Sequence, residues 1–102
     1  MRAERSDQFL ADVESYAYYL FESSPESSFR FVDAVEQTVR VIETMPLGGS
    51  AMPSSRHLLL RARGVIGFRQ MLVLYEPREE TLLLVRLIHG ARDLPTLFAE
   101  ET

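Results

Sequence analysis

The chain has 102 residues, 46% of them hydrophobic, and it contains no cysteine. A chain of this length buries roughly 60–70% of the surface that its unfolded form exposes, so residues 1–102 are expected to form one domain. Without cysteine, disulfide frameworks and thiolate zinc sites are excluded, and we expect no metal or cofactor. The charged N-terminus lacks the apolar core of a signal peptide, and no apolar run approaches the ~20 residues of a membrane span. A cytoplasmic protein without membrane contact is therefore expected.

The charge is divided unevenly along the chain. All 11 basic residues are arginine, and the net charge is −4, which argues against general binding of nucleic acids. Residues 1–47 carry four arginines against nine acidic residues, whereas residues 48–95 carry seven arginines against four acidic residues. This asymmetry indicates an acidic partner for the second half of the chain.

The N-terminal half has the spacing of two amphipathic helices after a short possible strand at residues 1–5. Phe9, Val13, Tyr16 and Leu20 lie on one face of the first predicted helix, which Ser6 caps. Ser24 caps the second helix, Pro25 occupies its first position, and the helix ends before Pro46. Its predicted apolar stripe, with Phe31 and Met45 at the edges, consists of Val32, Val35, Val39 and Ile42. The short connection between the helices predicts an antiparallel hairpin.

Runs of strand length follow at residues 56–63, 66–77 and 80–89. Turns are predicted at Arg63-Gly64 and around Pro77. The second and third runs are apolar on both faces, so they are expected in the middle of the sheet. The predicted fold is α+β: an N-terminal strand, then a helical hairpin packed on a three- to four-stranded, mainly antiparallel sheet. A short helix at the C-terminus completes it.

The order of these motifs resembles that of ParE-type toxins of the ParE/RelE superfamily, also known as plasmid stabilisation proteins. The features that carry the resemblance are the Pro-x-Gly turn after the hairpin, "LLLR" at residues 58–61, "GFRQMLVLYE" at residues 67–76 and "VRLIHGARD" at residues 85–93. The resemblance implies the toxin of a type II toxin–antitoxin system, neutralised by a ParD-like antitoxin. ParE-type members inhibit DNA gyrase by protein binding, without catalysis and without direct contact with nucleic acid.

RelE-type relatives share the fold but are ribosome-dependent mRNA endonucleases, so the residues must distinguish the two functions. A nuclease could use His89 as acid or base, Arg61 and Arg86 as cations, and Tyr75 as a hydroxyl. Strand alternation opposes this, because Leu84, Arg86 and Ile88 would share one face and Val85, Leu87 and His89 the other unless a bulge intervenes. The RelE-type relatives carry a strongly basic surface for ribosomal RNA, with lysines near the site and a tyrosine close to the C-terminus. This chain has a net charge of −4, no lysine and no tyrosine after Tyr75, which disfavours the nuclease. A third alternative is a non-toxic, antitoxin-bound regulatory subunit.

An antitoxin segment with acidic and apolar side chains would suit arginines set in an apolar surface, because the guanidinium binds carboxylates in a fork. Arg61, Arg69 and Arg86, on the uncovered face of the sheet, are the candidates for this role. The resemblance places the target contact in the C-terminal part, from His89 to Thr102, with His89, Arg92, Asp93 and Leu94 as its candidates. Purely structural roles compete with these. His89 can be a hydrogen-bonded residue at a strand end, Arg92 and Asp93 can form a local ion pair or a helix cap, and Arg86 can meet an acid of the fold.

Overall fold

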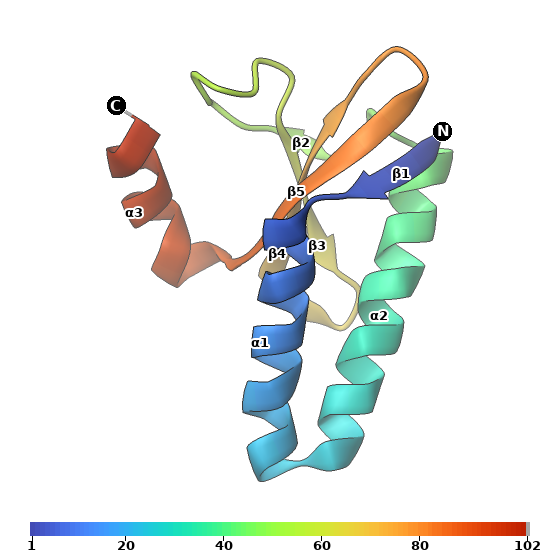
Figure 1. The fold of residues 1–102 in the computed structure, drawn as a ribbon, viewed down its shortest axis with the longest axis vertical. Coiled ribbons are helices and arrows are strands. Elements are labelled where there is room, and N and C mark those ends of the chain that lie inside the picture. The colour runs from blue at the N-terminus through green and yellow to red at the C-terminus, as the bar shows by residue number, and fades with distance from the viewer. Residues whose placement is uncertain (102) are drawn as a thin grey trace.

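The computed structural model describes residues 1–101, and the side chains up to residue 97. A helical hairpin packs against one face of a five-stranded sheet, and a third helix lies beyond the end of the sheet (Figure 1). In chain order the elements are β1 (Arg2–Arg5), α1 (Asp7–Ser23), α2 (Pro25–Thr44), β2 (Ser50–Ala51), β3 (Arg61–Val65), β4 (Phe68–Pro77), β5 (Thr81–His89) and α3 (Gly90–Glu101). The predicted α+β class, helical hairpin and C-terminal helix are confirmed.

Both predicted helix caps are present. The Ser6 hydroxyl accepts a hydrogen bond from the Phe9 N–H at 3.0 Å, and the Ser24 hydroxyl accepts one from the Ser27 N–H at 3.2 Å. Pro25 occupies the first turn of α2, where its missing N–H removes no intrahelical bond. One connecting residue, Ser24, therefore ends α1 and starts α2, which forces the two helices into a tight hairpin.

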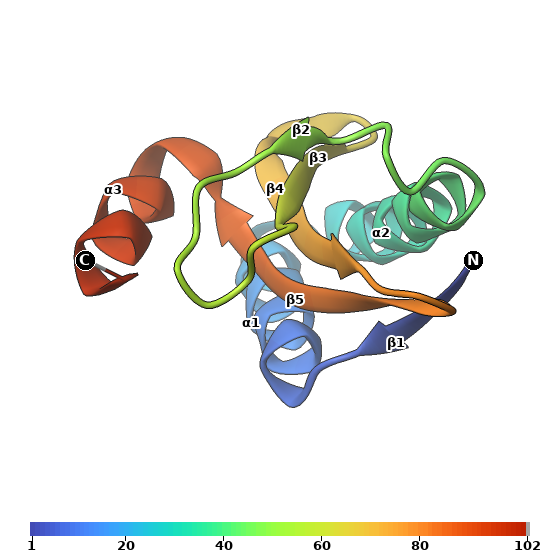
Figure 2. The same ribbon diagram turned by 90° about the horizontal axis from the view of Figure 1, so that it is seen from above.

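The strand order is β1-β5-β4-β3-β2, with β1 parallel to β5 and the other pairs antiparallel. The interior positions predicted for the two most apolar runs, β4 and β5, are confirmed. The two-residue strand β2 brings the sheet to five strands, one more than expected. Figure 2 shows β1 and β2 at the two outer edges of the sheet.

The strand predicted over residues 56–63 begins late, at Arg61. Leu58 and Leu59 are 84% and 65% exposed in the loop that precedes it. The turn predicted at Arg63-Gly64 lies instead at Ile66-Gly67, because the tight hairpin needs a residue with positive φ and Gly67 provides one at φ 77°. Gly64 therefore remains within β3.

The sheet carries an apolar cluster on each face. The larger cluster joins the helical hairpin to the sheet and includes Phe9, Phe31, Val35, Tyr75 and Leu84. The apolar stripe predicted for α2 is wrong at its first position. Phe31, predicted at the edge of the stripe, is fully buried, whereas Val32, predicted within it, is 38% exposed. The second cluster consists of Leu60, Ala62, Leu74 and Ile88, against which Met52, Leu72, Val85, Leu94 and Leu97 pack. The face expected to be uncovered is thus partly covered by the loop before β3 and by α3.

A β-bulge in β5 changes which side chains share a face. Leu74 pairs with Arg86 while the next residue, Tyr75, pairs with Leu84, so Val85 is the extra residue. As a result Leu84 and Leu87 both join the helix-facing core, whereas Val85 and Ile88 belong to the second cluster. The simple alternation predicted for this strand is wrong at the bulge.

Candidate partner-binding site

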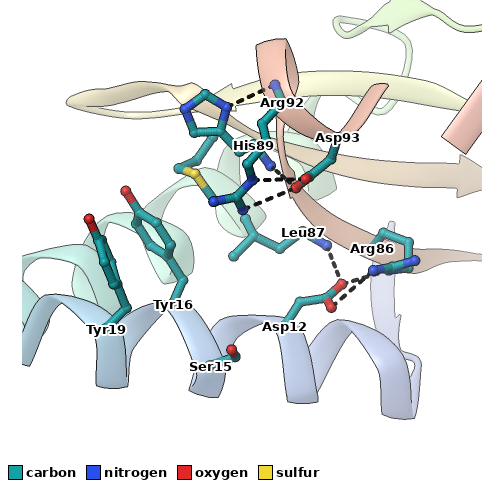
Figure 3. Close-up of a pocket in the computed structure, with 10 residues that line it drawn as sticks. Asp12, Ser15, Tyr16, Tyr19, Arg86, Leu87, His89, Arg92 and Asp93 are labelled. Atoms are coloured by element: carbon teal, nitrogen blue, oxygen red, sulfur yellow. Dashed lines mark hydrogen bonds and ion pairs between the residues drawn. The ribbon is translucent and has the colours of Figure 1, made fainter. Parts of the chain in front are cut away.

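A cleft of about 350 Å³ opens where α1, the end of β5 and the start of α3 meet (Figure 3). Residues from all three elements, and Met71 of β4, line it. Its polar lining consists of Asp12, Ser15, Tyr16, Tyr19, Arg86, His89, Arg92 and Asp93. The cleft brings together three of the four residues predicted to contact the target, His89, Arg92 and Asp93.

Asp12 fixes α1 to the end of β5. Its carboxylate accepts hydrogen bonds from Arg86 Nε at 2.8 Å and from the backbone N–H of Leu87 at 3.0 Å. Arg86 therefore meets an acid of the fold, which confirms the structural role predicted for it as an alternative to partner binding. Arg86 pairs with Leu74 of the second cluster, so its predicted place on the face opposite the hairpin is confirmed, and from there its guanidinium reaches Asp12. Its role in antitoxin binding stays a prediction.

His89 and Asp93 cap α3 reciprocally. The His89 Nδ1 accepts a hydrogen bond from the Arg92 N–H at 3.2 Å, and the Asp93 carboxylate accepts one from the His89 N–H at 2.8 Å. This pattern satisfies donors at both sides of the helix start, as a capping box does. Because Nδ1 accepts, the ring hydrogen lies on Nε2 in this arrangement. The structural roles foreseen for these two residues are confirmed.

Arg92 and Asp93 also form the predicted ion pair, with Arg92 Nε 2.9 Å from the Asp93 carboxylate. The hydrogen bond from Arg92 lowers the pKa of Asp93, and the His89 N–H acts in the same direction while partial burial opposes it. The same bond raises the pKa of Arg92. The Asp93 carboxylate therefore stays charged to a lower pH than an ordinary aspartate.

The Asp93 cap should make stability depend on pH. Its pKa in the folded chain lies below the ordinary value of 3.8, so its stabilising effect is present above that value and is lost as the pH falls through the lowered pKa. We expect Asp93→Asn to lose at most about 1 kcal/mol of unfolding free energy at neutral pH, because it removes a negative charge from the first turn of α3 and the ion pair with Arg92. In urea denaturation the gap between wild type and variant should shrink below about pH 4. A gap that is the same at pH 3 and pH 7 would contradict the charged cap.

Two tyrosines of α1 form the opposite wall of the cleft. The rings of Tyr16 and Tyr19 lie 5.6 Å apart, and both rise from α1 toward the strand end that carries His89 (Figure 3). Tyr16 also packs edge-on against Phe31, whereas Tyr19 is 64% exposed. Sequence analysis placed Tyr16 on the apolar face of the first helix and missed the cleft. The available signal was the spacing of Asp12, Tyr16 and Tyr19, which places the three on adjoining positions of one helical face.

The remaining candidates lie elsewhere. Arg61 donates to the Gly49 carbonyl at 2.6 Å, and the buried Tyr75 hydroxyl donates to the Pro46 carbonyl at 2.9 Å and accepts from the Gly49 N–H at 3.0 Å. Both residues therefore hold the chain that follows α2. Because Arg61 pairs with Tyr75, whose neighbours Val73 and Leu84 face the hairpin, the prediction that Arg61 lies on the uncovered face is wrong.

Arg69 is exposed at the start of β4, beside Arg63, and Leu94 packs half-buried against the second cluster. The four nuclease candidates do not gather in one site. Arg86 and His89 line the cleft, whereas Arg61 pairs with Tyr75. Tyr75 lies four residues from Met71, the β4 partner of His89, or about 13 Å along the strand. The side chains of residues 98–102, part of the predicted target-binding segment, lie outside the described residues.

The sequence predicts neither a membrane span nor a metal site for residues 1–101. None of the helices in this range is long and apolar enough to cross a membrane. Among the described side chains, those of residues 1–97, histidine and acidic residues do not form a group of three that could hold a metal ion. The polar groups of the cleft are hydrogen-bond donors, tyrosine hydroxyls and paired carboxylates.

Comparison with known proteins places the chain among the small α+β toxins of toxin–antitoxin systems. A solved structure described as the chromosomal ParDE TA system from P. aeruginosa matches with a TM-score of 0.65 and 16% identity, covering 87% of this chain and 95% of that chain. The family model for the ParE toxin of type II toxin–antitoxin system, parDE, matches residues 3–94. The chain belongs to the ParE toxin family. Among curated proteins, none matches significantly.

Proposed function

We propose that this chain inhibits DNA gyrase by binding to it and that a ParD-like antitoxin neutralises it. Family membership makes it a ParE toxin of a toxin–antitoxin system. The observation that carries the finer proposal is that the side chains a nuclease would need are engaged in the fold. His89 caps α3, Arg86 is held by Asp12, and Arg61 and Tyr75 hold the segment after α2.

The cleft supports a binding role because its carboxylates are engaged while donors remain available. Asp12 and Asp93 accept bonds from neighbouring arginines and backbone N–H groups. The hydroxyls of Tyr16 and Tyr19 and the exposed guanidinium of Arg92 line the same opening. We propose that the target contacts this opening, with Arg92 and the tyrosines as binding residues and His89 and Asp93 as the supports that position α3.

The proposal is tested by producing the chain in cells without its antitoxin. We expect growth arrest with loss of negative supercoiling of a reporter plasmid and intact mRNA, and recovery when the antitoxin is produced. Codon-dependent cuts in mRNA that vanish in His89→Ala would establish the RelE-type alternative instead. Unaffected growth with folded protein would indicate the non-toxic regulatory subunit.

A further inference from the structure

The two edges of the sheet differ in whether their backbone groups are satisfied. Beyond β1, the free edge of β5 is closed by side chains. The Val85 carbonyl accepts from the Ser6 hydroxyl at 2.9 Å, the Leu87 N–H donates to Asp12 at 3.0 Å and the His89 N–H donates to Asp93 at 2.8 Å. These three contacts occupy backbone groups that an added strand would need at this edge.

The opposite edge is open beside Gly64. Strand β2 pairs only with Arg61 and Ala62, so the rest of β3 has no neighbouring strand on that side. The Leu60 carbonyl accepts from the Met52 N–H at 2.9 Å, on the β2 side of the chain. Backbone groups two residues apart in a strand point to the same side. Those of Leu60, Ala62 and Gly64 therefore all point to the β2 side, and at Gly64 this is the outer side of the sheet. Gly64 has no side chain to screen them.

The hollow along this edge carries positive charge. Its lining includes Arg63 and Arg69 and, among the described residues, no acidic side chain, although the whole chain has a net charge of −4. Ile66, which is 48% exposed, and the half-buried Leu72 supply apolar surface beside the arginines. An extended segment with carboxylates and apolar side chains complements this edge in hydrogen bonding, charge and shape.

We propose that the antitoxin adds an extended, acidic segment to β3, pairing its backbone with Gly64 and its carboxylates with Arg63 and Arg69. This inference rests on the proposed antitoxin partner and assigns it a surface separate from the cleft. The two surfaces lie at opposite edges of the sheet, because β3 borders β2 and the cleft borders the free edge of β5 (Figure 2).

The direct test is amide hydrogen exchange of the free toxin and of its complex with the cognate antitoxin, both as full chains. The Gly64 amide should exchange rapidly in the free toxin and at least about 100-fold more slowly in the complex, because strand pairing protects it. The Leu87 and His89 amides serve as internal controls and should be protected in both samples. A complex that leaves Gly64 exchange unchanged would overturn this inference while the proposed function stands, whereas failure to form a complex would overturn both.

A charge-reversal variant tests the arginines separately. Arg63→Glu with Arg69→Glu should weaken antitoxin binding on the order of tenfold per arginine, measured by calorimetry. Arg40→Glu, which reverses an exposed arginine on α2, is the matched control and should change the affinity by less than about threefold. Because all three positions face solvent at least in part, circular dichroism should show unchanged folding. Equal affinities for the double variant and the control would overturn the assignment.

Discussion

Phe31→Ala should destabilise the protein severely, because it empties the centre of the larger apolar cluster. The Phe31 ring is fully buried, with Tyr16 at 4.9 Å and Phe68 at 5.2 Å from its centroid, so it joins α1, α2 and the sheet. Truncating a buried phenylalanine costs about 3–5 kcal/mol through lost burial and the cavity left behind. For a domain of this size that corresponds to a fall in Tm of about 20 °C, measurable by calorimetry.

Phe29→Ala is the matched control for this prediction. Phe29 lies on the same helix and contacts the ring of Phe21 at 6.3 Å, but it is 64% exposed at the tip of the hairpin. Its truncation should cost less than about 1 kcal/mol. Similar losses for the two variants would mean that Phe31 does not occupy the centre of the core.

Asp12→Ala should cause a smaller but still large loss of stability. It removes a carboxylate that is only 11% exposed and that accepts from both Arg86 and the Leu87 N–H. Removing one partner of a buried ion pair costs about 3–5 kcal/mol, and the 35% exposure of the Arg86 side chain reduces this to roughly 2–3 kcal/mol. Urea denaturation measures the loss, and exchange of the Leu87 amide should accelerate.

Two further variants separate charge from hydrogen bonding at this position. Asp12→Asn keeps an acceptor for the Leu87 N–H and should recover part of the loss. Glu36→Ala breaks the surface pair with Arg5, whose atoms lie 2.6 Å apart but whose side chains are 33% and 42% exposed, and should cost at most about 1 kcal/mol. Equal losses for Asp12→Ala and Glu36→Ala would show that Asp12 does not anchor α1 to β5.

Local sequence signals predicted the helices well because short-range chemistry determines their ends. Ser6 and Ser24 each sit where a hydroxyl can reach a free N–H three residues on, and Pro25 fits only the first turn of a helix. The interior strands were equally clear, because β4 and β5 are apolar on both faces. The family resemblance was confirmed over residues 3–94.

The candidate site was harder to predict because it depends on contacts between distant residues. Arg86 meets Asp12 across 74 positions of sequence, and a single extra residue at Val85 decides which face of β5 each side chain joins. A bulge cannot be recognised from the sequence of an apolar run. Strand alternation therefore assigned some side chains of β5 to the wrong face of the sheet. The prediction that Arg61 lies on the uncovered face was wrong for a similar reason. Its guanidinium donates to the backbone carbonyl of Gly49, a contact that the sequence pattern does not reveal.

The structure divides the predicted polar residues into those that build the fold and those that remain for partners. Arg61, Tyr75, Arg86, His89 and Asp93 are held by hydrogen bonds within the chain. Exposed or partly exposed side chains line the two surfaces: Tyr19 and Arg92 at the cleft, where Arg92 also pairs with Asp93, and Arg63 and Arg69 at the open edge. This division is consistent with the proposal that the toxin acts by binding other proteins.

The most direct test of the proposed function is supercoiling of relaxed plasmid by purified DNA gyrase, with and without this protein freed from its antitoxin. We expect supercoiling to be lost as the toxin is added, to return when the antitoxin is supplied in excess, and to persist with an Arg92→Ala variant that remains folded. Full supercoiling in the presence of folded wild-type toxin would contradict the assignment of gyrase as the target.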